Sequence, residues 1–161
     1  MFCEFCGNKL EIKPLKNEGL VPYCNHCKEF RFPKFNVAIS AIILSPDKKE
    51  VLLIKQYDKD FYRFVAGYTN KGESLEHTLL REIKEEVSLD VDYYKPLKSA
   101  YYEKTDTLLM NYMAVVKDKN VKMNEEVQNY KWFKIDEAEE ALKEAKLAHE
   151  FYEYFIKNMD K

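Results

Sequence analysis

Apolar runs of strand length, separated by polar and turn-forming residues, dominate the hydrophobic pattern of the chain. The longest, Val37 to Leu44, is interrupted only by Ser40. The run Ser45-Pro46-Asp47 then favours a turn. Counting such runs and their boundaries, we expect strands over Asn36–Leu44, Val51–Gln56, Phe61–Val65, Leu97–Tyr102, Thr107–Val116 and Tyr130–Ile135.

Three segments show helical spacing instead, and they run over Leu75–Val87, from Asp136 to about Lys143, and over Leu147–Asn158. In the first, Ser74 is a suitable N-cap, and Leu80, Ile83 and Val87 form an apolar stripe. Asp136 is expected to cap the second. In the third, an aromatic stripe suited to core packing comprises Phe151, Tyr154, Phe155 and Met159. Periodicity alone therefore indicates an α/β or an α+β protein.

Length and charge narrow the class of protein. The chain has 161 residues, 46% of them hydrophobic, and a formal net charge of −2. This length suits one medium-sized domain plus a small appendage, and the charge gives no reason to expect general affinity for polyanions. No basic N-terminal stretch precedes an apolar segment, and no run approaches roughly 18 uninterrupted apolar residues. We expect a soluble cytoplasmic protein without a membrane partner.

All four cysteines lie near the N-terminus, as Cys3-x2-Cys6 and Cys24-x2-Cys27, with seventeen residues between the pairs. This spacing is typical of a closed structural zinc site. Two disulfides are the alternative, and they do not suit a protein that stays in the cytoplasm. We expect residues 1–33 to form a zinc ribbon whose metal supplies much of its folding free energy, ahead of a domain over residues 34–161.

The segment from Gly67 onwards concentrates charge in the pattern G-x5-E-x7-R-E-x-x-E-E, formed by Gly67, Glu73, Arg81, Glu82, Glu85 and Glu86. A helix advances about 100° per residue, so the last three glutamates share one face. Arg81 can form a bidentate pair with Glu73 or a neighbouring acid, but one guanidinium cannot neutralise the cluster. A divalent cation can, and oxygen ligands select Mg²⁺ or Mn²⁺. The alternative is a solvated acidic helix face.

These residues resemble the signature of the Nudix hydrolases, G-x5-E-x7-R-E-U-x-E-E-x-G-U, in which U is aliphatic. Ile83 and Leu89 fill the aliphatic positions, whereas Ser88 replaces the last glycine. A left-handed residue is expected there, so we expect serine either to cost about 1 kcal/mol or to end the helix differently. The resemblance implies an α+β fold, a small α/β/α sandwich with a mixed sheet, preceded by the ribbon. It also implies Mg²⁺- or Mn²⁺-dependent hydrolysis of a nucleoside diphosphate linked to another moiety.

The resemblance also assigns roles to residues. The ligands of the catalytic metal are expected to be the side chains of Glu82, Glu85 and Glu86 with the carbonyl of Gly67. A carboxylate then takes a proton from the attacking water, and Glu82, Glu86 and Glu126 are the open choices for this base. Arg81 and Glu73 complete the catalytic set.

A ribbon ahead of the signature narrows the resemblance to the NADH pyrophosphatase branch. The run from Cys24 to Glu29 resembles the branch's second zinc knuckle, and Ala66-Gly67-Tyr68 resembles its entry to the signature. Glu126, six residues before Trp132, matches a glutamate that completes the metal site of the branch from a loop. Glu125 is the alternative if the register slips by one. The branch resemblance further suggests a homodimer.

The substrate is less determined than the chemistry. Where the branch carries Ser-Gln-Pro-Trp, its substrate signature, this chain has Ser99-Ala100-Tyr101-Tyr102-Glu103. NADH, NAD-capped RNA ends and ADP-ribose all remain candidates. Tyr68, Tyr101 and Tyr102 are candidates for stacking on a nucleobase. A second hypothesis is a nucleotide-sensing regulator on a Nudix scaffold, with the ribbon contacting a protein or nucleic acid. A third is that the ribbon binds nucleic acid while the large domain has no active role.

Overall fold

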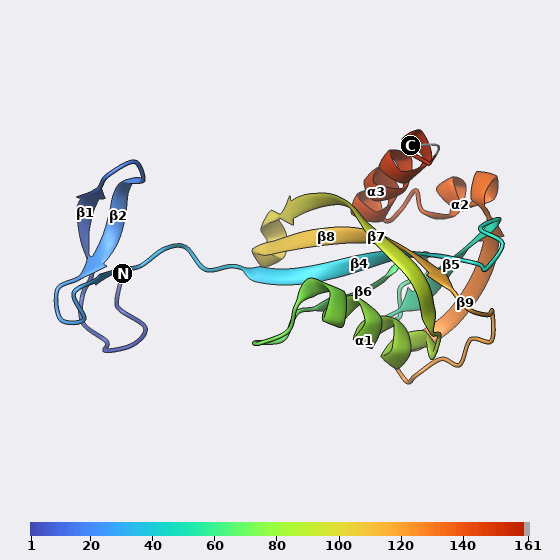
Figure 1. The fold of residues 1–161 in the computed structure, drawn as a ribbon, viewed down its shortest axis with the longest axis horizontal. Helices are drawn as coiled ribbons and strands as arrows, with labels where there is room; N and C mark the ends of the chain where they lie inside the picture. The colour runs from blue at the N-terminus through green and yellow to red at the C-terminus, as the bar shows by residue number, and fades with distance from the viewer. Residues whose placement is uncertain (160–161) are drawn as a thin grey trace. The chain divides into compact units, whose positions relative to one another are not determined.

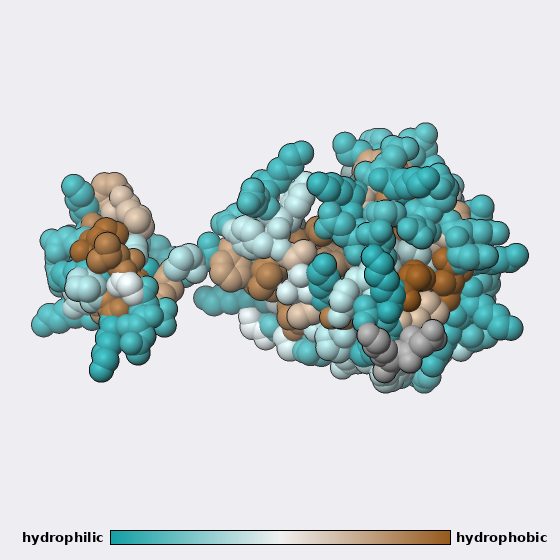
Figure 2. All heavy atoms as spheres, turned by 90° about the horizontal axis from the view of Figure 1, so that it is seen from above, coloured by the Kyte–Doolittle hydropathy of each residue, from teal (hydrophilic) through white to brown (hydrophobic). Residues whose placement is uncertain are grey.

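The computed structural model describes residues 1–159 and divides into two compact units, one comprising Met1–Phe35 and the other beginning at Asn36. In the first unit, an antiparallel sheet has the order β1-β2-β3, with bounds β1 Glu11–Leu15, β2 Gly19–Cys24 and β3 Glu29–Phe30 (Figure 1). So few residues cannot enclose a core. Phe2, Phe5 and Leu20 therefore stay exposed, and Figure 2 shows hydrophobic patches on the surface of this unit.

The second unit contains a six-stranded mixed sheet, whose strands are β4 Asn36–Leu44, β5 Glu50–Gln56, β6 Val65–Tyr68, β7 Val91–Tyr102, β8 Thr107–Val116 and β9 Val127–Lys134. Its order is β7-β8-β4-β5-β9, and β6 also pairs with β4. Strand β4 runs parallel to β8 and antiparallel to β5 and β6. It pairs with β6 from Ala38 to Ala41 but with β5 only at Ile43 and Leu44. Strand β6 therefore takes the place of β5 beside the first half of β4.

Helices cover both faces of this sheet, with bounds α1 Leu75–Val87, α2 Ile135–Ala141 and α3 Lys146–Lys157, and a 3-10 turn, η1, occupies Glu103–Thr105. Figure 1 shows α1 on one face and α2 and α3 on the other. This arrangement confirms the α+β fold with an α/β/α sandwich. No helix in the part of the chain that the structure describes is long and apolar enough to cross a membrane.

Two hydrophobic clusters, one on each face of the sheet, hold the layers together. Ile39 and Ile43 of β4 pack in the cluster that includes the buried side chains of α1. Ile42 and Leu44 belong to the cluster that includes α2 and α3. Side chains alternate between the faces of a strand, so a strand covered on both faces must be apolar throughout. This requirement explains the long apolar run that marks β4 in the sequence.

One predicted strand was wrong. The segment Phe61–Val65 is mostly a loop, because pairing with β4 begins only at Val65. Before that point, Arg63 makes an isolated bridge with Ile54. The chain leaves β5 through residues with positive φ, 55° at Tyr57 and 52° at Asp58, which directs it away from the sheet.

Two further strands begin earlier than predicted. Strand β7 starts at Val91 rather than Leu97, and its register shifts between Pro96 and Lys98. A proline at a bulge of an edge strand is tolerated, but it hides the strand from a pattern search. Strand β9 starts at Val127 rather than Tyr130.

The helices differ from the sequence predictions in the N-cap of α2 and in the buried faces of α1 and α3. The N-cap of α2 is Lys134 rather than Asp136, which instead lies in the first turn, where a negative charge suits the helix dipole. In α1, Leu79 is buried and Leu80 is exposed. The buried face of α3 is formed by Phe151, Tyr152 and Phe155, whereas Tyr154 is only half-buried and Met159, predicted in the same stripe, is exposed. The Tyr152 hydroxyl donates to the Ile135 carbonyl at 2.7 Å.

Helix α1 begins and ends where the sequence predicts. The Ser74 hydroxyl accepts a hydrogen bond from the His77 backbone N–H at 3.1 Å, which satisfies one of the free donors at the helix start. At the other end, Ser88 adopts a left-handed conformation with φ 58° and ψ 24°. Its backbone N–H donates to the Lys84 carbonyl at 3.1 Å. Glycine tolerates this conformation more readily than serine.

Replacing Ser88 with glycine should therefore stabilise the protein. We expect Ser88→Gly to raise the free energy of unfolding by about 0.5–1 kcal/mol, measured by urea denaturation. Ser88→Ala keeps the Cβ and should give no such gain. A stabilisation of equal size in both variants would show that the left-handed backbone is not the cause.

Candidate active site

The carboxylates of α1 converge beside the β6 strand. Glu82 and Glu86 lie on the inward side, with only 12% of the Glu82 side chain and 2% of Glu86 exposed, whereas 55% of the Glu85 side chain is exposed. Ile83 and Val87, buried in the core, fix the rotation of the helix. The acids thus occupy the border between the core and a cleft.

Arg81 links the acids on the outer side of this cluster. It forms a bidentate pair with Glu73, from Nε to Oε1 at 2.7 Å and from Nη2 to Oε2 at 2.9 Å. It also donates to Glu82 at 2.6 Å, to Glu85 at 3.1 Å and to the Tyr68 carbonyl at 3.0 Å. Hydrogen bonds from Arg81, with another from the backbone of the loop before α1, lower the pKa of Glu73 to about 2. The arginine therefore ties the helix to the loop and strand that precede it.

Gly67 allows a carboxylate to lie against the backbone of β6. A Cβ atom at this position would be 2.0 Å from Cδ of Glu82 and 2.2 Å from its Oε1. No side chain can occupy that space unless Glu82 moves. Glycine is therefore required here by close approach, since any larger residue would displace Glu82 from the cluster.

Glu86 lacks a hydrogen-bonding partner at one of its oxygens. Among the residues that the structure describes, none bonds to the buried Oε2 atom. Burial, followed by the charges of Glu82, Glu126 and Glu85, raises the pKa of Glu86 to about 8. An unpartnered buried carboxylate oxygen beside other acids suits a hard divalent cation such as Mg²⁺ or Mn²⁺. The donor set therefore fits the metal that the sequence predicts.

These side chains line a cleft of about 940 Å³. Glu126, in the loop before β9, lines it together with the three glutamates of α1, whereas Glu125 is not among the described residues that do so. Of the tyrosines predicted to contact substrate, Tyr68 and Tyr102 line the cleft. The structure does not bring Tyr101 there, since consecutive strand residues point to opposite faces. Its hydroxyl donates to Asp106 instead.

Sequence reasoning missed one wall of the cleft. This wall comes from the end of β5 and the connection that follows it, and the residues in it that line the cleft include Gln56, Tyr57, Phe61 and Arg63. Their only signal in the sequence is their position just before Gly67. The pattern over Phe61–Val65 is typical of a strand and does not itself indicate a binding site.

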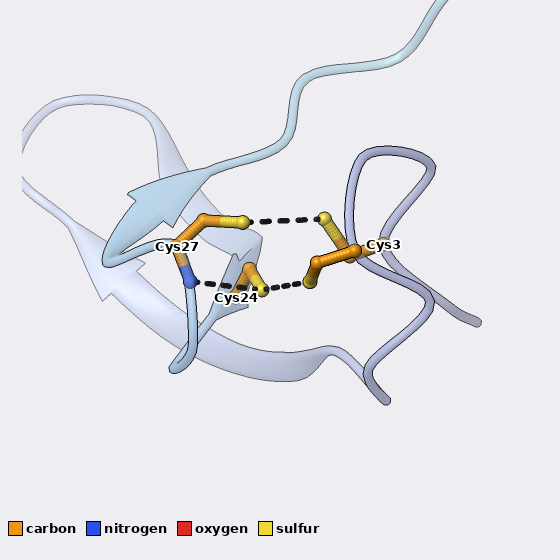
Figure 3. A group of neighbouring side chains, drawn as sticks. Cys3, Cys24 and Cys27 are labelled. Carbon is orange, nitrogen blue, oxygen red and sulfur yellow. Dashed lines mark hydrogen bonds between the residues drawn. The ribbon is translucent and has the colours of Figure 1, made fainter.

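The four cysteines of the first unit lie close together, and Figure 3 shows Cys3, Cys24 and Cys27 of this group. Their sulfur atoms lie within 4.8 Å of one another, with Sγ–Sγ distances of 3.9 Å for Cys3–Cys27 and 3.5 Å for Cys6–Cys24. The Cys27 backbone N–H donates to the Cys24 sulfur at 3.4 Å. The cluster can hold a metal ion, because four thiolates suit a tetrahedral site.

The thiols of this cluster differ in acidity. Although burial opposes it, a hydrogen bond from Arg31 helps to lower the pKa of Cys3 to about 6. A hydrogen bond with Cys6, together with burial, raises the pKa of Cys27 to about 12. Because the environment of Cys27 disfavours its thiolate, a bound cation would be needed to make this cysteine a metal ligand.

A family model described as the NUDIX domain matches residues 34–155. The chain belongs to the Nudix family. The match covers the sheet, α1 and most of α3, so the family predicted from the Gly67–Glu86 pattern is confirmed.

Similar proteins include other members of this Nudix family. The NAD-capped RNA hydrolase NudC of Pectobacterium atrosepticum is 29% identical over 140 residues, which cover 84% of this chain and 52% of that protein. NudC of Vibrio vulnificus is 25% identical over 162 residues, covering 98% of this chain and 60% of that protein. The chain thus spans only about half the length of the first relative. A Nudix hydrolase structure from Nitrosomonas europaea, 17% identical, covers 97% of this chain and 90% of its own with a TM-score of 0.66.

The raised pKa of Glu86 makes the stability of this Nudix domain depend on pH. The folded protein keeps a proton that the unfolded chain releases above about pH 4.5, so stability should fall as the pH rises towards 8. In buffer free of Mg²⁺ and Mn²⁺, Glu86→Gln should remove this loss and raise the free energy of unfolding at pH 8 by on the order of 1–3 kcal/mol. At pH 5 the difference should be small.

Urea denaturation across this pH range measures the effect. Glu85→Gln is the matched control, because the Glu85 side chain is 55% exposed. Stability curves for wild type and Glu86→Gln that run parallel from pH 5 to pH 8 would contradict the expectation.

Proposed function

We propose that this protein is a Mg²⁺- or Mn²⁺-dependent Nudix pyrophosphohydrolase. It would cleave the diphosphate bond of a nucleoside diphosphate linked to another moiety, of the NADH, NAD or ADP-ribose class. The observation that carries the proposal is the buried Glu86 oxygen without a partner, beside Glu82 and Glu85 in an open cleft. A purely structural acidic face would have no reason to bury one of its carboxylates in this way.

The cleft residues would have two roles, metal binding and positioning of the metal ligands. Glu82, Glu85, Glu86, Glu126 and the Gly67 carbonyl would hold the catalytic metal. When bound, the metal would neutralise phosphate charge and acidify water. Arg81 and Glu73 would position the ligands, because their bidentate pair fixes the start of α1 against β6.

Proton transfer falls to a carboxylate of the cleft. Glu82, Glu86 and Glu126 all line it and remain candidates for the base that takes the proton of the attacking water. Tyr68 and Tyr102, at the same cleft, would stack on the nucleobase.

Substrate choice within this class is open. The NudC relatives are named for NAD-capped RNA, which supports an NAD-like substrate, free or on an RNA end. The branch resemblance supports a homodimer. A cytoplasmic location suits four cysteines that must stay reduced to bind zinc.

A substrate panel tests the enzyme directly. NADH, NAD⁺, FAD, ADP-ribose, ADP-glucose, nucleoside triphosphates and NAD-capped RNA would be incubated with Mg²⁺ or Mn²⁺ and assayed for released mononucleotide. We expect Glu85→Gln to lower kcat by at least about 100-fold with little change in thermal unfolding. Glu76→Gln, exposed in the first turn of the same helix, is the matched control and should keep activity. Saturable nucleotide binding without product would favour a regulator instead.

We further propose that the four cysteines bind one structural Zn²⁺. Purified protein should contain one equivalent of zinc by mass spectrometry, and a chelator should abolish amide protection in residues 1–35 before it affects the second unit. Cys24→Ser should lose the zinc. Thiol titration of the denatured, unreduced protein distinguishes the alternatives: four reactive thiols fit a zinc site, whereas none would indicate two disulfides.

A further inference from the structure

Arg63 lies in the wall of the cleft that the β5–β6 connection forms. Its backbone is held by two hydrogen bonds with Ile54, each 2.9 Å, so the position of the residue is fixed by the sheet. Its side chain lines the same cleft as Glu82 and Glu86. A positive group therefore stands beside the acidic cluster without belonging to it.

Among the residues that the structure describes, no carboxylate pairs with this guanidinium. The chain contains three arginines. Arg31 pairs with Glu29 at 2.7 Å, and Arg81 pairs with three carboxylates. Within residues 1–159, Arg63 forms no ion pair of this kind, and its buried Nε atom has no hydrogen-bonding partner. Such a group is costly to bury unless a partner is supplied.

Two aromatic rings hold the guanidinium in place. Its central carbon lies 4.8 Å from the ring centroid of Phe61 and 5.9 Å from that of Tyr57. Such contacts restrict the side chain without neutralising its charge. Burial lowers the pKa of Arg63, but an arginine remains protonated in proteins. The result is a charged, pre-oriented fork of donors that is only partly hydrated.

Glu86 is an alternative partner, since its charge acts on Arg63. The two side chains nevertheless form no hydrogen bond within the described residues. If Glu86 holds the catalytic metal, the negative charge of Glu86 is neutralised by that metal rather than by Arg63. An anion that enters the cleft could then neutralise the charge of Arg63 and accept its hydrogen bonds.

We propose that Arg63 binds a phosphate group of the substrate's diphosphate. Its positive charge would hold the phosphate on the wall formed by the β5–β6 connection, in the same cleft as the negatively charged glutamates. This inference rests on the proposed function, because it takes the diphosphate as the ligand of the cleft. The planar fork of arginine matches two phosphate oxygens, and binding here would orient the diphosphate relative to the carboxylates of α1.

Two substitutions separate charge from packing. Arg63→Met keeps an apolar stem against the Phe61 ring and removes the charge, whereas Arg63→Lys keeps the charge but not the fork. Lys157→Gln, exposed at the end of α3 and outside the cleft, controls for the loss of one positive charge. The probe is α,β-methylene-ADP, a diphosphate that the enzyme cannot cleave, and its binding is measured by calorimetry in Mg²⁺.

We expect Arg63→Met to weaken binding of this probe about 10- to 100-fold, and Arg63→Lys to weaken it less. Thermal unfolding and Mn²⁺ affinity should stay near wild type. If the chain is an enzyme, kcat/KM should fall by a similar factor for NADH and for NAD-capped RNA. The control should match wild type throughout.

Three outcomes would overturn the assignment. In the first, Arg63→Met binds the probe as wild type does. In the second, only NAD-capped RNA is affected, which would place the RNA backbone on Arg63 rather than the diphosphate. In the third, Mn²⁺ affinity changes more than about 10-fold, which would make Arg63 a counter-ion of Glu86. Because probe binding does not require turnover, an inactive wild type would refute the proposed enzyme while leaving this comparison decisive.

Discussion

Mutual repulsion among carboxylates in a partly dehydrated cleft is the constraint around which this domain is built. Glu82, Glu85 and Glu86 face the same opening, and Glu126 reaches it from another loop. One guanidinium, that of Arg81, bonds to Glu82 and Glu85 but not to Glu86. The remaining charge is removed by protonation or by a cation, and only the cation leaves the carboxylates ionised. The acidic cluster is thus a binding site whose negative charge a bound cation would neutralise.

The fold keeps these groups together because the elements that carry them are rigid and adjacent. Helix α1 is anchored by Leu79, Ile83 and Val87, which are all fully buried. Strand β6 pairs with β4 in the centre of the sheet and presents Gly67 to the helix. The bidentate pair of Arg81 then joins helix and loop. Buried apolar surface, at roughly 25 cal/mol per Å², offsets the cost of crowding like charges.

What could be predicted from sequence was mainly local. The bounds of α1 follow from Ser74 and the spacing of its side chains, because capping and helical geometry involve neighbouring residues. Tyr101 could not be separated from Tyr102 in the same way, since the face that each presents depends on the register of β7 after its bulge. The position of Arg63 in the cleft could not be predicted from sequence for a related reason. Its aromatic surroundings have strand propensity, and only the tertiary path of the chain decides that they form a wall.

The two proposed metal sites differ in what each requires of the protein. The four cysteines lie within a segment too small for a core, so their ion would replace packing and the site can be closed. The acidic site lies on a domain with its own hydrophobic core, and it would have to stay open to admit the proposed diphosphate substrate. Thiolates and carboxylates also select different ions. One chain can therefore hold a soft-ligand ion for folding and a hard-ligand ion for chemistry without exchanging them.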